Sequence, residues 1–547
     1  MDRRNFVRLG TVAGALALRG KPVSGMPIAS HDSHASPLAR HAIADFELEE
    51  ATIADLQSAM ASGRFSARAI VEQYTDRIEE LNRKGPELRH VIEVNPDARS
   101  IAESLDAERK AGRVRGPLHG IPVLLKDNID TADRMTTTAG SYALEGSIPL
   151  RDAYSSQRLR EAGAILLGKA NMSEWANFRS TRSSSGWSGR GGQAKNPYVL
   201  DRNPCGSSSG SAGAVAANLT ALAVGTETDG SIVCPSAMVG IVGVKPTLGL
   251  VSRSGIIPIA HSQDTAGPMA RTVRDAAILL NGLVGVDPRD RATSPSRAKG
   301  FTDYTQFLAV DGLRGARIGV AREKFFGYSA TADKVIEDAI EQLKLLGAVI
   351  VDPANIPTAG KFDDTEFEVL LYEFKADLNA YLASLGPRAP VRTLKDIIDF
   401  NERNREKEMP YFGQEIMLMA QKKGPLSERK YRTALATNLR MSRAQGIDAV
   451  IEKHRLDALI APTGSPAWPT DLINGDHYIG ASSTPAAVAG YPNIQVPAGH
   501  VHGLPVGISF FGRAWSEPVL FRFAYAFEQA TKHRRPPQFL PTVRFSA

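Results

Sequence analysis

Residues 205–247 read CGSSSGSAGAVAANLTALAVGTETDGSIVCPSAMVGIVGVKPT. The stretch opens with a Gly/Ser-rich loop at 206–211 and carries a second serine-bearing turn at 229–231. The segment between them favours a small-residue helix followed by a buried strand. Such a loop–helix–strand–turn unit can fold back on itself, so we expect Ser207 and Ser231 to meet although 24 residues separate them.

The rest of the chain alternates short apolar runs with helical patterns. The clearest helix is 333–346, where apolar residues share one face and Gly347 supplies the stop. Apolar runs of strand length occur at 121–125, 164–167, 222–224, 241–244, 316–320, 349–351, 458–460, 494–496 and 506–510. Strands that alternate with helices indicate an α/β fold with a mixed central sheet flanked by helices.

The chain has 547 residues, and neither an internal repeat nor a low-complexity linker divides residues 47–540. We therefore expect one large domain over that range. Residues 360–440 are charged and helical in pattern, and they form either an excursion that covers a pocket or a solvated helical layer. No apolar run reaches the roughly 18 residues that a spanning helix needs, so we expect no stable membrane anchor.

The N-terminal segment has a different composition. A basic stretch precedes a short Gly/Ala-rich apolar run, which is typical of an export signal. The paired Arg3 and Arg4 resemble a twin-arginine signal. We expect residues 1–30 to be that signal and 31–46 to be a disordered mature N-terminus, in a protein exported to the periplasm or secreted.

The same segment carries most of the excess charge. Of the net charge of +6, residues 1–30 contribute +4, from Arg3, Arg4, Arg8, Arg19 and Lys21 against Asp2. The remainder is too small to favour nucleic acid as a partner.

Two cysteines, Cys205 and Cys234, lie beside the motif serines. Two cysteines exclude a disulfide framework, and the absence of histidine from the segment disfavours a zinc site. If the serines meet, the thiols lie close to each other as well. We favour free buried thiols over a disulfide here, and we expect neither a metal nor a cofactor.

A serine hydroxyl is a weak nucleophile that needs a base within hydrogen-bond reach. The nearest histidines, His119 and His261, are typical of turn and loop positions, and the Gly-x-Ser-x-Gly match at 206–210 lacks a downstream Asp…His order. A lysine can serve if burial lowers its pKa from about 10.4 to near neutrality. Lys126 ends the apolar run 121–125, where an ammonium group would be desolvated.

Together these segments resemble the amidase signature family. The family combines an upstream lysine with a Gly-Ser-Ser-x-Gly-Ser loop, a Thr-[Asp/Glu]-x-Gly-Gly-Ser turn and a Gly-x-Lys-Pro-Thr tail. This chain supplies Lys126 and then 206–211, 226–231 and 243–247. Further matches lie at 168–171, 264–271, 461–463 and 496–507. The resemblance covers about residues 47–535 and implies the amidase signature fold.

Carried over position by position, the resemblance implies a catalytic triad of Lys126 as base, Ser207 as bridging serine and Ser231 as nucleophile. The bridging serine follows a cis peptide bond in the family, which would be Gly206–Ser207 here. The implied oxyanion hole consists of the backbone N–H groups of Thr228, Asp229, Gly230 and Ser231. The implied reaction is hydrolysis of a linear amide to carboxylate and ammonia through an acyl-enzyme on Ser231.

Two positions depart from the family pattern. Asp229 replaces the first glycine of Gly-Gly-Ser, and Val233 stands where arginine is frequent. The residues around Asp229, together with 173–180 (SEWANFRS), resemble the peptide amidase branch, whose members remove ammonia from C-terminal peptide amides. The Asp229 carboxylate either faces the substrate or holds nearby N–H groups in a turn.

We therefore expect an amidase for peptide amides or related small amides. A fatty-acid-amide or aryl-acylamide hydrolase of the same family is an alternative, because the sequence does not show the shape of the pocket. A third alternative is the amidase subunit of a glutamyl-tRNA amidotransferase. The expected export signal and the small net charge of the mature chain disfavour it. A non-catalytic binding protein on this fold is disfavoured because Lys126, Ser207 and Ser231 are all retained.

Overall fold

The computed structural model describes residues 45–387 and 389–545, which all belong to one unit. The expected export signal at 1–30 lies outside the described residues, as does the expected N-terminal segment 31–46 apart from its last two residues.

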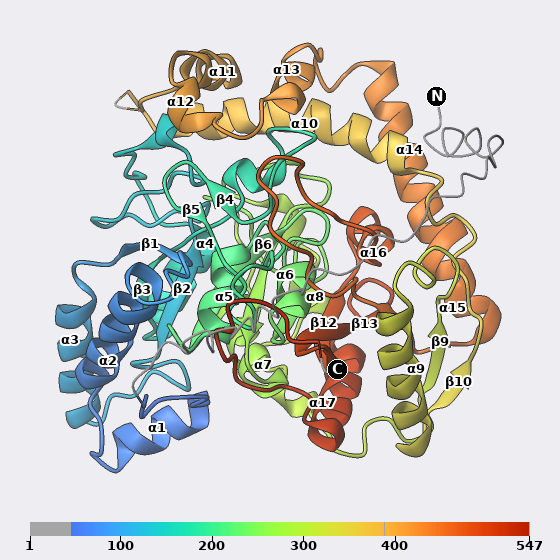
Figure 1. Cartoon of the computed structure of the whole chain (residues 1–547), viewed down its shortest axis with the longest axis horizontal. Helices are drawn as coiled ribbons and strands as arrows, with labels where there is room; N and C mark the ends of the chain where they lie inside the picture. The colour runs from blue at the N-terminus through green and yellow to red at the C-terminus, as the bar shows by residue number, and fades with distance from the viewer. Residues whose placement is uncertain (1–44, 388, 546–547) are drawn as a thin grey trace, which may run out of the picture. The chain divides into compact units, whose positions relative to one another are not determined.

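A mixed sheet of eleven strands runs through the described part of the chain (Figure 1). Its order is β1-β3-β2-β6-β8-β7-β12-β13-β11-β9-β10. The strands β3, β2 and β6 are parallel, as are β11, β9 and β10, whereas the strands between these groups pair antiparallel. The bounds are β1 Val91–Val94, β2 Pro122–Lys126, β3 Ile165–Ala170, β6 Leu222–Glu227, β7 Val242–Lys245, β8 Thr265–Ala270, β9 Arg317–Val320, β10 Val349–Val351, β11 Ala458–Pro462, β12 Asn493–Val501 and β13 Leu504–Phe511. A separate two-stranded sheet pairs β4 Trp187–Ser188 with β5 Gly192–Gln193.

Helices flank this sheet, and the helices α10 to α14 lie together along one edge of the view in Figure 1, in yellow and orange. Within the described ranges no helix combines the length and the apolar character needed to span a membrane. The α-helices are α1 Ile53–Ala61, α2 Ala67–Ile78, α3 Ala98–Lys110, α4 Tyr154–Glu161, α5 Ser209–Ala216, α6 Val233–Met238, α7 Val273–Leu283, α8 Ser296–Lys299, α9 Ala330–Leu345, α10 Asp363–Ser384, α11 Leu394–Arg403, α12 Arg405–Glu408, α13 Glu415–Gln421, α14 Arg429–Ser442, α15 Asp448–His454, α16 Thr484–Ala489 and α17 Glu517–Thr531.

The expected α/β fold with a mixed sheet is confirmed, and each expected strand overlaps an observed one. The expected helix 333–346 is α9, which starts three residues earlier because the Ser329 hydroxyl caps it by accepting from the N–H of Ala332. Four of the described strands were not expected: β1 and β8 in the large sheet, and the two-residue strands β4 and β5. The sequence of β8 does not indicate a strand, because Gly267 and Pro268 both have low strand propensity.

The parallel pair β2 and β6 positions the serine-rich stretch. Because the carboxyl ends of parallel strands meet at one edge of a sheet, the end of β2 at Lys126 lies beside the end of β6 at Glu227. Helix α5 packs closely against neighbouring loops: a Cβ on Gly213 would lie 2.1 Å from the His90 ring, and one on Gly210 would lie 2.4 Å from the His90 carbonyl oxygen. The small residues of this helix therefore permit the close approach of α5 to the segment at His90.

A buried ion pair joins the segment 173–180 to the helical region. The guanidinium of Arg179 contacts the carboxylate of Glu174 and the backbone carbonyl of Glu408, and all three side chains are fully buried. The same guanidinium lies 4.2 Å from the centre of the Phe412 ring. This anchor holds the loop that carries Ala176 against α12, and Ala176 lines the cavity described below.

Candidate active site

Lys126 lies at the end of β2, a strand that is buried along its whole length. Its side chain is fully buried, and its amine nitrogen lies 2.7 Å from Ser207 Oγ. The amine also donates to Thr226 Oγ1 at 2.9 Å and to the Thr226 carbonyl at 3.2 Å. Asn128 donates to the same Thr226 hydroxyl at 3.0 Å, which fixes the position of that acceptor.

Burial lowers the pKa of Lys126 from 10.5 to about 7, against the opposing effect of the charges on Asp264 and Glu227. Within the described residues no carboxylate forms an ion pair with the amine; its partners are hydroxyl and carbonyl oxygens. Desolvation without a paired charge favours the neutral amine, which is the protonation state that a general base requires.

The bond between Gly206 and Ser207 is cis, as the resemblance implied. Ser207 is fully buried, while Ser231 is 8 % exposed. The N–H of Ser208 donates to the Ser231 carbonyl at 3.1 Å, which holds the two serine segments side by side. Among the described contacts no hydrogen bond joins the Ser207 and Ser231 hydroxyls. The structure thus brings Lys126 into contact with Ser207, and it places Ser231 on the segment next to Ser207.

The loop 228–231 presents its backbone N–H groups in an unusual way. In the described part of the chain none of these four groups donates to the protein, whereas the next two, on Ile232 and Val233, donate to Glu227 Oε2 at 2.8 and 3.0 Å. Gly230 has φ of +78°, a conformation that residues with a Cβ seldom adopt. Unpaired N–H groups on a turn form a site that suits a developing oxyanion.

The side chain of Asp229 has a structural partner. Thr484 Oγ1, in the first turn of α16, donates to Asp229 Oδ2 at 2.6 Å. Burial raises the pKa of Asp229. This contact ties the loop 228–231 to α16 through a hydroxyl and not through the N–H groups of a turn, and Asp229 Oδ1 is buried without a hydrogen-bond partner among the described residues.

Cys205 and Cys234 form a disulfide, with 6.1 Å between their Cα atoms. The expectation of free thiols is therefore wrong. The physical reason is the fold itself: the segment that carries Ser207 and the first turn of α6 lie side by side, which brings the two sulfur atoms within bonding distance. The disulfide covalently joins the loop before Ser207 to the helix after Ser231.

A cavity of about 430 Å³ reaches the same region. It lies between the loop 253–265 and the C-terminal half of α10, and both Thr226 and Thr228 belong to its lining. Thr228 Oγ1 donates to Asp264 Oδ1 at 2.6 Å, so this wall of the cavity is continuous with the loop 228–231.

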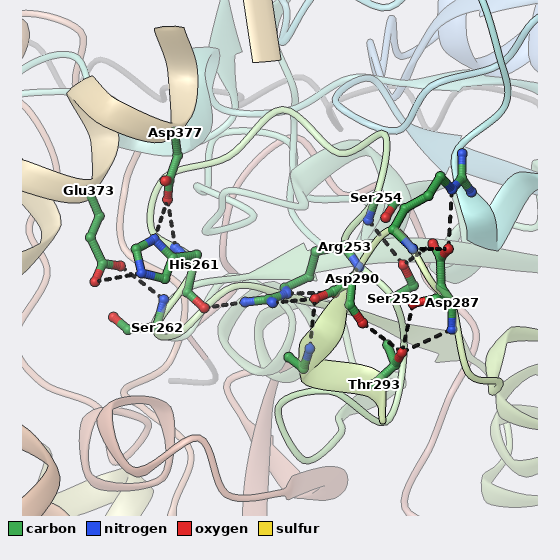
Figure 2. A network of polar contacts seen from close by, with 12 residues as sticks. Ser252, Arg253, Ser254, His261, Ser262, Asp287, Asp290, Thr293, Glu373 and Asp377 are labelled. Atoms are coloured by element: carbon green, nitrogen blue, oxygen red, sulfur yellow. Dashed lines mark hydrogen bonds and ion pairs between the residues drawn. The ribbon is translucent and has the colours of Figure 1, made fainter. Parts of the chain in front are cut away.

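His119 and His261 occupy turn and loop positions as expected. The ring of His119 contacts the Leu105 carbonyl at 3.0 Å, a structural role. The contacts of His261 were not predicted: Nδ1 lies 2.8 Å from Asp377 and Nε2 lies 3.4 Å from Glu373 (Figure 2). These three residues form a group whose ligand atoms are close enough for a metal ion, but both ring nitrogens already face carboxylates, so ion pairing accounts for the cluster.

Comparison with known proteins gives consistent results. A family model described as Amidase matches residues 69–521. The X-ray structure of native peptide amidase from Stenotrophomonas maltophilia has a TM-score of 0.87 and 52% identity, covering 90% of this chain and 100% of that chain. The crystal structure of an amidase family protein from Bacillus anthracis has a TM-score of 0.81 and 40% identity, covering 90% of this chain and 93% of that chain. A probable amidase of Arabidopsis thaliana is 45% identical over 504 residues, 90% of this chain and 93% of that protein.

The disulfide generates a prediction about stability. Native protein should contain no titratable thiol, and denatured, reduced protein should contain two. Reduction should lower the free energy of unfolding by about 2–4 kcal/mol, because the unfolded chain gains the freedom of the opened loop. A double variant, Cys205→Ser with Cys234→Ser, should be destabilised by a similar amount and should lose all sensitivity to reductant. Equal denaturant midpoints for oxidised and reduced protein would contradict this prediction.

Proposed function

The chain belongs to the amidase signature family and is a hydrolase of carbon–nitrogen amide bonds, and on that premise we propose that it hydrolyses C-terminal peptide amides through Lys126, Ser207 and Ser231. The observation that carries the proposal is the fully buried amine of Lys126, 2.7 Å from Ser207 Oγ and without a paired carboxylate in the described chain.

The hydrogen bonds around Lys126 support the direction of proton transfer. A neutral amine has two N–H donors and one lone pair. The carbonyl and the hydroxyl of Thr226 accept from the amine, so both donors have acceptors. The lone pair then faces Ser207, whose hydroxyl becomes the donor in the 2.7 Å contact. In this arrangement Lys126 receives a proton from Ser207, and Ser207 is ready to receive one from Ser231.

Ser231 then attacks the amide carbonyl, forming a C–O bond. The developing oxyanion lies at the unpaired N–H groups of the loop 228–231, where each lost donor would cost about 10²–10³ in rate. The proton held on Lys126 returns through Ser207 to the departing nitrogen, since an amide anion is a poor leaving group. Water activated by the same relay hydrolyses the acyl-enzyme to carboxylate.

The choice of peptide amides as substrate has two supports. Similarity to a peptide amidase extends over 90% of this chain at 52% identity. A cavity of about 430 Å³ adjoins the loop 228–231, which is more space than a simple carboxamide such as acetamide fills.

We also propose that the mature protein is exported. The paired Arg3 and Arg4 before a short apolar run suit the twin-arginine route. The disulfide between Cys205 and Cys234 is independent support, because disulfides persist in oxidising compartments and are rare where thiols are kept reduced.

Replacement of the proposed nucleophile and base tests the mechanism. Ser231→Ala and Lys126→Ala should each lower kcat/KM for a peptide amide by about 10³-fold or more, measured as ammonia release. Ser236→Ala is a matched control, because Ser236 is a buried serine of α6 whose hydroxyl has no hydrogen-bond partner among the described residues. Full activity in either of the first two variants would refute the triad. A panel with fatty-acid amides and simple carboxamides tests the substrate, and ammonia from fatty-acid amides alone would exclude peptide amides.

The pKa of Lys126 determines the expected pH dependence. Burial places this pKa at about 7, so the fraction of neutral base increases as the pH rises through that value. The plot of log(kcat/KM) against pH should rise with a slope near one below about pH 7 and reach a plateau above it. An acidic limb with its midpoint near 10 would show that Lys126 is charged in the free enzyme.

Export can be tested separately from catalysis. Changing both Arg3 and Arg4 to lysine should abolish secretion of the mature protein, whereas Arg19→Lys in the same segment should not affect it. The measurement is the distribution of protein between cells and the exported fraction. Unchanged export in the double variant would contradict the twin-arginine route.

A further inference from the structure

The cavity between the loop 253–265 and α10 has charged groups that pair with one another (Figure 2). Arg253 forms two contacts with Asp290, at 2.8 and 2.6 Å, and its guanidinium also donates to the His261 carbonyl. The His261 ring lies between Asp377 and Glu373. The third cation in the described lining, Arg289, contacts Asp287 at 3.2 Å.

These pairings determine which ligands the cavity disfavours. Carboxylates engage Arg253 and His261 closely, whereas Arg289, whose side chain is 31% exposed, contacts Asp287 through Nε. Asp264 also belongs to the lining and is buried, with its oxygens accepting from Thr228 and from the N–H groups of Ile259 and Ala260. An acidic ligand would therefore lie close to the carboxylates of Asp264, Asp290 and Asp377, and the two cations nearest to them, Arg253 and His261, already pair with carboxylates.

The remaining lining combines apolar side chains with uncharged polar residues, which are Asn128, Thr226, Thr228, Ser254, Thr265, Tyr381 and Ser384. Ile256, Ile257 and Ile259 are 7%, 5% and 6% exposed and line the cavity from the loop side. Ala380 lines it from α10. A concave site of this volume, with an apolar wall of three isoleucines and uncharged polar groups around it, suits an uncharged apolar or aromatic group.

Because hydrolysis of a primary amide releases only ammonia, the leaving group does not need a cavity of 430 Å³ beside the loop 228–231. We propose that this cavity is a specificity site for the acyl side of the substrate, and that it receives an uncharged apolar or aromatic side chain of a peptide amide. This inference rests on the proposed function and adds the chemical class of residue that the enzyme prefers.

The test compares two peptide amides that differ only in the last residue, phenylalaninamide or glycinamide, as substrates for the full-length mature enzyme. The wild type should prefer the phenylalaninamide by about 10–100-fold in kcat/KM, the range that burial of one aromatic side chain supports. Ala380→Trp, which fills the cavity from α10, should remove this preference and leave kcat/KM for the glycinamide within about threefold of wild type. Ala380→Leu should give an intermediate preference.

Ala383→Trp is the matched control, because Ala383 is an exposed alanine of the same helix outside the described lining of the cavity. This variant should keep the wild-type preference, and thermal unfolding should show that all three variants are folded. An unchanged preference in Ala380→Trp would overturn the inference. A second result would also overturn it. If Ala380→Trp selectively lowered kcat/KM for an anilide of the same glycine peptide, the cavity would hold the leaving amine. Absence of ammonia from both peptide amides with the wild type would overturn the proposed function itself.

Discussion

The burial of one amine at the end of β2 is the constraint on which the rest of the site depends. Lys126 is fully buried, and its neighbours are the oxygens of Ser207 and Thr226 rather than a paired carboxylate. Removing an ammonium group from water is costly, so burial lowers the pKa of this lysine to about 7 and a neutral base becomes accessible near physiological pH. The parallel pairing of β2 with β6 supplies both the burial and the two acceptors on Thr226.

The other features of the site keep two segments in place around that amine. Ser208 joins them through the carbonyl of Ser231, and the disulfide between Cys205 and Cys234 joins them covalently. Asp229 ties the loop 228–231 to α16 through Thr484. Thr228 donates to Asp264, which connects the same loop to the proposed specificity cavity. Lys126, the two serine segments and the proposed specificity cavity thus meet at one edge of the sheet.

The motifs predicted the family, the mixed sheet and the burial of Lys126, because these features are local: a buried strand and two serine-bearing turns can be recognised from neighbouring residues. Features that depend on residues far apart in the sequence were either not predicted or predicted wrongly. The contact of His261 with Asp377 joins residues 116 positions apart and exists only because α10 folds over the loop. Cys205 and Cys234 are also brought together by tertiary packing, and composition alone favoured free thiols.

The central claim is that the two serines have unequal roles, with Ser231 forming the acyl-enzyme and Ser207 relaying the proton to Lys126. The most direct measurement is acid quenching of the wild-type enzyme during turnover of a peptide amide, followed by fragment-ion mass spectrometry of the segment that contains both serines. The mass of the acyl group should be found on Ser231. Its presence on Ser207, with Ser231 unmodified, would contradict the mechanism.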